Sequence, residues 1–313
     1  MNIAYRFRIY PTEEQKILLG KTFGCCRFLY NQMLDDKIRE YEKTKKMLKN
    51  TPAMYKKEYP FLKEIDSLAL ANVQLHLEKA YKNFFRDSKI GFPRFKTKHH
   101  SKNSYTTNVV NGNILVESKK IRLPKLKWIA MKKHREPAEG LRLKSVTVSM
   151  EPSGKYFASL LYEGYSCENQ AAEPDYSTAK ILGIDYAMQG MAVFSEKIET
   201  EEAGFFRKNE KRLAREQRKL SRCVRGSHNY ELQKKKVARC HEKIRNQRRD
   251  HLHKLSRKIA DSYDAVAVED IDMKAMGQCL HFGKSVQDNG YGLFREMLDY
   301  KLVWQGKKMV KVD

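Results

Sequence analysis

The sequence lacks any run of about eighteen apolar residues, the length at which a membrane-spanning helix is predicted. Its first residues, MNIAYRFRIYP, lack the apolar core of a signal peptide. None of its six cysteines lies in a CxxC pair, so no zinc site is predicted in this chain. Cysteines scattered in this way are typical of reduced, structural thiols. These absences favour a cytoplasmic protein with no membrane partner.

Acidic residues are scarce relative to basic ones. The 313 residues include 62 Lys and Arg but only 38 Asp and Glu, which gives a formal net charge of +24. This excess is far larger than solubility requires, and it favours a polyanionic partner. A hydrophobic content of 41%, with 17 Tyr and 14 Phe, is nevertheless typical of a folded protein. The length is sufficient for two or three domains with a sizeable core.

Helical patterns dominate the first hundred residues after one short strand. Residues 3–10 alternate as a strand, and Thr12 with Gln15 matches a capping box at the start of a helix. Apolar periodicity continues from there into the charged stretch that ends near residue 49, and it resumes over residues 66–85. Residues 11–88 are therefore predicted to form a small helical bundle.

Strand patterns replace the helical ones between residues 104 and 165. Residues 141–150 alternate strictly, and the Asn-Gly-Asn sequence at 111–113 is typical of a hairpin. We interpret this region as a small antiparallel barrel or sandwich. If residues 2–10 supply a further strand, the helical bundle is an insertion into this β-domain. The polar residues 166–177 are expected to be a linker.

Residues 91–98 (GFPRFKTK) interleave aromatic and basic side chains. One interpretation is an exposed basic loop with Phe92 and Phe95 turned inward. The other is a nucleic-acid contact in which Arg94 and Lys96 bind phosphates and an aromatic face stacks on bases. A pattern of this length favours neither interpretation.

Two apolar strands in the second half of the chain each end on an acidic residue. Residues 181–184 lead to Asp185, and residues 264–268 lead to Glu269. An ionised carboxylate on a buried strand is costly unless it is paired or binds a metal. Either acid alone is more simply explained as a turn residue. Two such strands together suggest that the carboxylates meet above one sheet.

Two acids on adjacent strands are the minimum for holding Mg²⁺. Nucleases with two metal ions about 4 Å apart use more carboxylates, because shared acids bridge the metals. Asp270 or Asp272 could assist Asp185 and Glu269 in this way.

The most basic region, residues 207–258, lies between the two acids. It contains twenty Lys or Arg and five Asp or Glu, and Gly226 with Ser227 divides it into two predicted helices. Only a narrow apolar stripe would pack, and the remaining cations would repel one another unless an anion lay along them. This favours a nucleic-acid-binding helix pair. Its expected contacts are Arg215, Arg218, Lys219, Arg222, Lys235, Arg245 and Arg248, and those elsewhere are Arg6, Arg8, Tyr30, Asn31, Arg94 and Lys96.

Several motifs resemble one known family. GIDYAMQGMAVFS and DAVAVEDIDMKAM are similar to the first two motifs of the RuvC-like nuclease domain in the TnpB/OrfB proteins of bacterial insertion sequences. GCCRFLYNQ, GFPRFKTK, EQRKLSRC and the final NGYGLF and YKLVWQGKKMVKVD also resemble the family, so the likeness covers nearly the whole chain. It implies a transposon-encoded, RNA-guided DNA endonuclease related to type V CRISPR effectors.

The resemblance implies an α+β multidomain fold. Its parts would be a wedge β-barrel at 1–10 and 100–170, a helical recognition lobe at 11–99, and a RuvC/RNase H-like α/β domain at 178–313. Asp185 and Glu269 would be the first and second catalytic ligands of a two-metal Mg²⁺ site. The partners would be a guide RNA from the element end and a double-stranded DNA target, in the nucleoid of a bacterial cytoplasm.

The chain departs from the family pattern at its C-terminus. The family continues beyond the last strand with a four-cysteine zinc ribbon and a helix bearing a third catalytic Asp. We therefore expect an incomplete RuvC-like site that cleaves DNA weakly or not at all. Two alternatives remain: a nuclease-dead, RNA-guided repressor, or an inactive fragment of a decayed element. Retention of two acids expected to be buried counts against the repressor.

Overall fold

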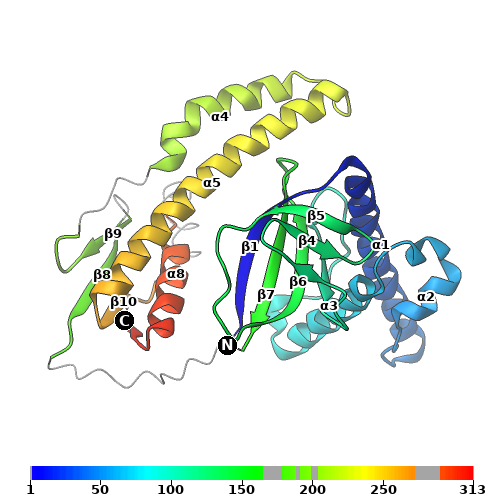
Figure 1. Cartoon of the computed structure of the whole chain (residues 1–313), viewed down its shortest axis with the longest axis horizontal. Helices are drawn as coiled ribbons and strands as arrows, with labels where there is room; N and C mark the ends of the chain where they lie inside the picture. Colours follow the sequence, from blue (N-terminus) through cyan, green and yellow to red (C-terminus); the bar gives the residue numbers. More distant parts are fainter. Residues whose placement is uncertain (1, 165–177, 188–190, 199–203, 272–289, 313) are drawn as a thin grey trace. The chain divides into compact units, whose positions relative to one another are not determined.

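The computed structural model describes residues 2–164, 178–187, 191–198, 204–271 and 290–312. The chain divides into two compact units, an N-terminal unit (Met1–Tyr165) and a C-terminal unit (Ser166–Asp313), and each has a mixed composition of helices and strands (Figure 1). The chain therefore has a mixed α+β fold. No helix within these ranges is long and apolar enough to cross a membrane.

A seven-stranded sheet forms the centre of the N-terminal unit, with the order β2-β6-β7-β1-β5-β4-β3. β1 (Ile3–Tyr10) lies between β7 (Tyr156–Glu163) and β5 (Lys127–Lys132) and is antiparallel to both. The prediction that the first strand joins the later ones is confirmed, so the helices are inserted between strands of one sheet. The other strands are β2 (Asn103–Asn108), β3 (Leu115–Val116), β4 (Lys120–Leu123) and β6 (Arg142–Met150).

The predicted hairpin at 111–113 is wrong. The chain does turn there, with positive φ values of 50° at Asn111 and 67° at Gly112. However, β2 pairs with β6 and β3 pairs with β4, so the strands that flank the turn are not partners. Asn113 closes the turn through its side chain, which accepts from Val110 N at 2.8 Å and donates to Asn108 O at 3.1 Å. No ladder in the described residues joins β2 to β3, and closure into a barrel stays a prediction.

The first helix, α1 (Glu13–Thr44), begins at the predicted capping box. Gln15 N donates to Thr12 Oγ1 at 3.3 Å, and Thr12 N donates to Gln15 Oε1 at 3.0 Å. Gln15 also donates through Nε2 to the carbonyls of Leu126 and Trp128, both at 2.9 Å, which fixes the start of α1 to the sheet. The helix ends earlier than predicted because Lys45 adopts a left-handed conformation, with φ of 56°.

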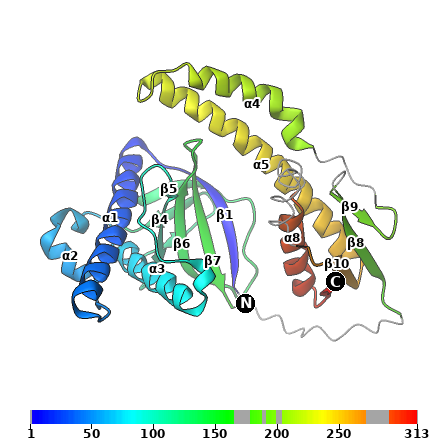
Figure 2. The ribbon, with the colours of Figure 1, turned by 180° about the vertical axis from the view of Figure 1, so that it is seen from behind.

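The second predicted helix is confirmed as α3 (Ser67–Arg86), with Asp66 as its N-cap. Asp66 accepts from Leu68 N at 3.0 Å and from the hydroxyl of Thr107 on β2 at 2.5 Å. α1 and α3 pack on each other and on β2 (Figure 2), and their apolar faces share one core with the sheet. Three short helical segments were not predicted: α2 (Pro52–Glu58), η1 (Pro60–Lys63) and η2 (Ser88–Ile90).

The C-terminal unit contains a four-stranded sheet with the order β11-β10-β8-β9. β8 (Ile181–Ala187) and β9 (Met191–Phe194) form an antiparallel pair, whereas β8, β10 (Ala265–Glu269) and β11 (Lys308–Val312) run parallel. Apolar residues of α5 (His228–Ser262) and α8 (Tyr291–Trp304) form the core with this sheet. α8 has its C-cap at Gln305, and Gly306 follows it with φ of 70°.

α4 (Phe205–Ser221) and α5 form a long helical hairpin, as predicted from the glycine between them (Figure 1). Gly226 has φ of 83°, and Ser227 caps α5 by accepting from Tyr230 N at 3.1 Å. The hairpin extends beyond the sheet (Figure 1), and most of its residues at that end are exposed.

We expect Asp66→Ala to lower the free energy of unfolding of the N-terminal unit by about 2–4 kcal/mol. The substitution removes a helix cap and leaves the buried Thr107 hydroxyl unpaired. Urea unfolding followed by circular dichroism measures the change. Thr107→Val is the matched control, and it should cost less because Asp66 still caps α3. A change below about 0.5 kcal/mol for Asp66→Ala would contradict this account.

Candidate functional site

Asp185 and Glu269 lie side by side at the carboxyl ends of adjacent parallel strands. Ile184 on β8 pairs with Val268 on β10, and the two acids are the next residues of their strands. Ligands of parallel sheets typically bind at this edge. The structure therefore brings together the two carboxylates that the sequence pattern singles out.

The two carboxyl groups interact directly. A hydrogen bond with Asp185 raises the pKa of Glu269, and partial desolvation and the negative charge of Asp185 raise it further. Two adjacent carboxylates repel each other when both are ionised. A divalent cation held between them would relieve this repulsion.

The expectation that the acids are buried is wrong. Asp185 and Glu269 are both exposed, although the preceding residues of their strands, Ile184 and Val268, are buried. Successive side chains of a strand point to opposite faces of the sheet. The acids therefore point away from the face on which Ile184 and Val268 are buried. Their retention therefore involves little burial cost, and it does not count against a function without cleavage.

Two tyrosine hydroxyls of this unit have unused hydrogen-bonding capacity, and that of Tyr291 lies near the acids. Tyr186 follows Asp185 on β8, and Tyr291 begins α8; their ring centroids are 5.1 Å apart. Within the described residues, both hydroxyls are buried and have no hydrogen-bond partner. Burial raises the pKa of Tyr291, and the charges of Glu269 and Asp185 raise it further. A buried unpaired hydroxyl costs about 1–3 kcal/mol, so a polar ligand or water beside the acids would stabilise this arrangement.

Asp270, a predicted helper, is already paired with cations. Its carboxylate lies 3.0 Å from Lys311 Nζ and 3.7 Å from a guanidinium nitrogen of Arg295. Arg295 also donates to the carbonyl oxygen of Glu269 at 3.1 Å. The other predicted helper, Asp272, lies outside the described residues. Among those described, no cluster of three or more His, Cys, Asp or Glu could hold a metal.

The donor set fits one hydrated Mg²⁺ ion. Mg²⁺ binds in proteins through one or two carboxylates and keeps several waters. Asp185 and Glu269 supply the carboxylates, and the hydroxyl of Tyr291 near them is suited to hydrogen-bond with such waters. A pair of metal ions needs additional shared carboxylates.

The helical hairpin exposes cations and buries acids. Glu216 and Glu242 are 9% and 7% exposed, and Glu216 lies 3.6 Å from Arg215 and 3.9 Å from Lys219, which it partly neutralises. Gln233 on α5 donates to the carboxylate of Glu216 on α4 at 2.8 Å, and this hydrogen bond lowers the pKa of Glu216. The predicted contacts on the exposed surface are Arg215, Arg218, Lys219, Arg222, Lys235 and Arg245, whereas Arg248 is half-buried.

The predicted contacts in the N-terminal unit differ in their availability. Arg6 forms an ion pair with Glu151 at 2.5 Å and lies 4.0 Å from the ring centroid of Phe157. Arg8 lies 5.4 Å from the same ring. These arginines therefore have internal partners, and their role as nucleic-acid contacts stays a prediction.

Tyr30 and Asn31 hold residues 91–98 against α1. Asn31 accepts from Lys96 N at 2.7 Å and donates to Lys96 O at 2.9 Å, while the Lys96 ammonium lies 3.8 Å from the Tyr30 ring centroid. Tyr30 is buried, so its ring positions Lys96. Sequence reasoning named these residues but did not foresee that they contact one another.

Of the two interpretations of residues 91–98, the structure does not support the one in which Phe92 and Phe95 turn inward, since these side chains are 45% and 51% exposed. Phe92 packs edge-on against Tyr81 and Phe84, with centroid distances of 5.6 and 5.4 Å. Arg94 between them is exposed, as a phosphate contact requires.

Family models match two parts of the chain. A model described as "Probable transposase", OrfB of IS605, matches residues 164–279, and a "Helix-turn-helix domain" model of the same family matches residues 1–46. A "Putative RNA-guided DNA endonuclease" of Streptomyces pristinaespiralis is 31% identical over 322 residues, covering 99% of this chain and 77% of that protein. This chain belongs to the IS605 OrfB family. "Putative RNA-guided DNA endonuclease InsQ" of Escherichia coli K12 is 30% identical over 336 residues, covering 99% of this chain and 80% of InsQ.

The fold of this OrfB-family chain resembles that of Cas12f1. The cryo-EM structure of a Cas12f1–sgRNA–target DNA complex matches with a TM-score of 0.56 and 12% identity, over 100% of this chain and 89% of that chain. At this identity the likeness concerns the fold alone. Within the described part of residues 1–46, the structure has one strand and the single long helix α1 in place of a helix-turn-helix.

Sequence reasoning missed Tyr186, Tyr291 and Arg295. Tyrosines at apolar positions of a strand and a helix are usually core residues, and nothing in their spacing shows that their hydroxyls stay unpaired or that Tyr291 lies near the acids. The arginine was hidden in the same way, because its contact with Glu269 O spans 26 residues of sequence.

We expect Glu269→Gln to become more stable relative to the parent as pH rises. A carboxyl whose folded-state pKa is raised binds more protons in the folded than in the unfolded chain. Its stabilisation is therefore present below the unfolded pKa of about 4.3 and is lost as pH rises through the folded pKa. Urea midpoints measured from pH 4 to pH 8 report the difference. Glu296→Gln, an exposed carboxyl on α8, is the control, and parallel curves for Glu269→Gln and the parent would overturn this assignment.

Proposed function

We propose that this chain is an RNA-guided, metal-dependent DNA endonuclease with Asp185 and Glu269 as its catalytic metal ligands. The observation that supports it best is the convergence of these two carboxylates at the carboxyl edge of a parallel sheet. Relatives that align with nearly the whole chain have names that state this activity.

A Mg²⁺ ion held there would polarise a phosphoryl oxygen and lower the pKa of bound water. The residues of the chain would prepare the site for this chemistry. Asp185 and Glu269 would hold the cation between their carboxylates, while Tyr291 would orient water through its hydroxyl. Arg295 would hold the end of β10 through the carbonyl of Glu269.

The basic helical hairpin would bind the nucleic-acid backbones. We propose that its exposed cations neutralise phosphates of a guide RNA and of a double-stranded DNA target. In this proposal, residues 1–10 and 100–170 form a wedge domain, residues 11–99 a recognition lobe, and residues 178–313 a RuvC-like domain. The protein would act in the bacterial cytoplasm, on the nucleoid.

A second candidate function is RNA-guided DNA binding without cleavage. One observation favours it: in the described parts of the chain, only two carboxylates meet at the site, and Asp270 is paired with Lys311 and Arg295. The exposure of Asp185 and Glu269 is compatible with it, because keeping them costs little. No observation on the described residues favours an inactive fragment.

We expect Asp185→Asn to abolish Mg²⁺-dependent cleavage of duplex DNA by the protein carrying its co-purified RNA, because the metal loses a charged ligand. Asp299→Asn, an exposed carboxylate on α8, should cleave like the parent. Gel analysis of linear duplexes with Mg²⁺ or EDTA measures the reaction. DNA binding without cleavage in the parent would favour the second function, and cleavage that persists in Asp185→Asn would exclude these ligands.

We expect the double substitution Arg218→Gln with Arg222→Gln to reduce the slope of log K against log salt by about 1–2 units, since each neutralised phosphate contributes about 0.7–0.9. The control is Lys254→Gln with Arg257→Gln on α5, whose cations are already paired with Asp250 and Asp261 at 2.7 and 2.8 Å. Fluorescence anisotropy with labelled RNA and duplex DNA gives both slopes. Equal slopes for the two double variants would refute the role of α4.

A further inference from the structure

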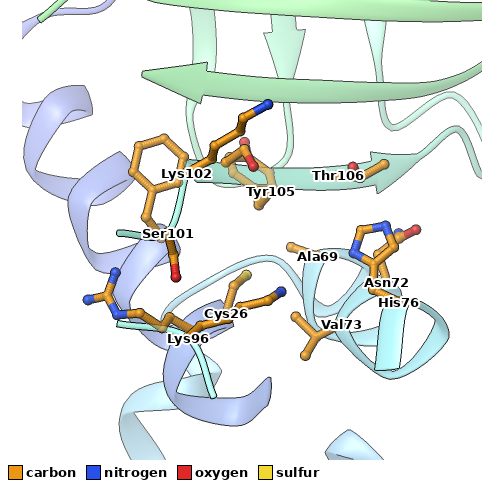
Figure 3. Close-up of a pocket in the computed structure, with 13 residues that line it drawn as sticks. Cys26, Ala69, Asn72, Val73, His76, Lys96, Ser101, Lys102, Tyr105 and Thr106 are labelled. Carbon is orange, nitrogen blue, oxygen red and sulfur yellow. The ribbon is translucent and has the colours of Figure 1, made fainter. Parts of the chain in front are cut away.

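A pocket lies in the N-terminal unit between α1, α3 and the start of β2 (Figure 3). Its cavity volume is about 170 Å³, and it opens to solvent. Sites that enclose a whole small ligand typically have volumes of about 300–1,000 Å³, so this open pocket has room for part of a nucleotide, such as the edge of its base or its phosphate group. It is separate in sequence from the basic hairpin and from the acid pair.

The charge of the pocket lining has one sign. Of its 13 residues, Arg27, His76, Lys96 and Lys102 carry basic groups, and none is Asp or Glu. In the described residues, no carboxylate forms an ion pair with Arg27, Lys96 or Lys102. A concave surface with unpaired cations attracts anions and concentrates them.

Lys96 is the cation that the protein positions most firmly. Its backbone is hydrogen-bonded on both sides to the Asn31 amide, and its ammonium rests over the Tyr30 ring. Burial lowers the pKa of Lys96, as expected for a cation without a counter-ion. A desolvated, unpaired charge is destabilising, and an anion in the pocket would offset that cost.

The side of the pocket formed by α3 is uncharged and polar. Asn72 is 7% exposed and donates to Leu68 O at 2.9 Å, which leaves its side-chain oxygen as an acceptor. His76 lies beside it (Figure 3), and burial and the charge of Lys96 lower the pKa of this imidazole. Burial also raises the pKa of the Cys26 thiol to about 12, so the thiol stays protonated. These groups can exchange hydrogen bonds with the edge of a base, while Val73 supplies an apolar contact.

We propose that this pocket binds a single nucleotide of a nucleic-acid strand, with its phosphodiester on Lys96 and Arg27 and its base against Asn72 and His76. The inference rests on the proposed function and adds a specific contact to it. The chemistry is common to RNA and DNA, and binding to each strand type decides which of them supplies the nucleotide.

The test compares two lysines of the same loop. Lys96→Gln removes the pocket cation, and Lys98→Gln removes an exposed cation two residues away that does not line the pocket. Both full-length variants are titrated with a fluorescein-labelled RNA hairpin and with a labelled duplex DNA. We expect Lys96→Gln to weaken binding of one probe about tenfold, and Lys98→Gln to weaken it less than twofold. Arg27→Gln provides a second test if Lys96→Gln fails to fold.

An NMR signal from inside the pocket distinguishes the loss of this one contact from a general loss of positive charge. The imidazole resonances of His76, assigned with His76→Gln, should shift in the parent when the bound probe is added and should not shift in Lys96→Gln. A shift with RNA alone identifies an RNA nucleotide, and a shift with DNA alone identifies a DNA nucleotide. Equal weakening of binding by Lys96→Gln and Lys98→Gln, or His76 resonances that do not shift, would refute nucleotide binding in this pocket and leave the proposed function intact. Failure of the parent to bind either probe would overturn both.

Discussion

The C-terminal unit depends on the parallel pairing of β8 with β10. That register places two strands of apolar side chains in one core and, one residue later, two carboxyl groups next to each other. The core residues make the pairing favourable, and the acids at its edge remain in contact with solvent. The register therefore brings two exposed carboxylates together, and a metal ion bound between them would offset their mutual repulsion.

The same unit separates charge in a second way. The α4–α5 hairpin buries Glu216 and Glu242 and leaves its lysines and arginines outside. A hydrogen bond from the neutral Gln233 side chain on α5 to the Glu216 carboxylate on α4 joins the two basic helices inside the hairpin. The carboxylate keeps its negative charge in this contact. A metal-dependent enzyme that acts on a nucleic acid requires a cationic surface for the phosphates and carboxylates for the metal ion, and this unit has both features.

The N-terminal unit is assembled by polar side chains that join helices to strands. Gln15 connects the start of α1 to two carbonyls of the sheet, and Asp66 caps α3 while it accepts from Thr107 on β2. Asn31 holds Lys96 to α1 by its backbone. The pocket lies between α1, α3 and β2, and the contact with Asn31 holds Lys96 at its lining. The packing of these elements thus leaves Lys96 without an ion-pair partner among the described residues.

Local chemistry allowed several elements to be predicted from the sequence alone. The capping box at Thr12, the glycine at 226 and the alternation of residues 3–10 act through neighbours in the chain, and the structure confirms all three. The two acid-ending strands were recognisable for the same reason. Strand partners and exposure depend on distant residues. The turn at 111–113 was therefore recognisable, whereas the pairing of β2 with β6 was not. Only the tertiary structure could show that Asp185 and Glu269 are exposed and that the hydroxyl of Tyr291 lies near them, because those positions result from packing between strands and helices far apart in the sequence.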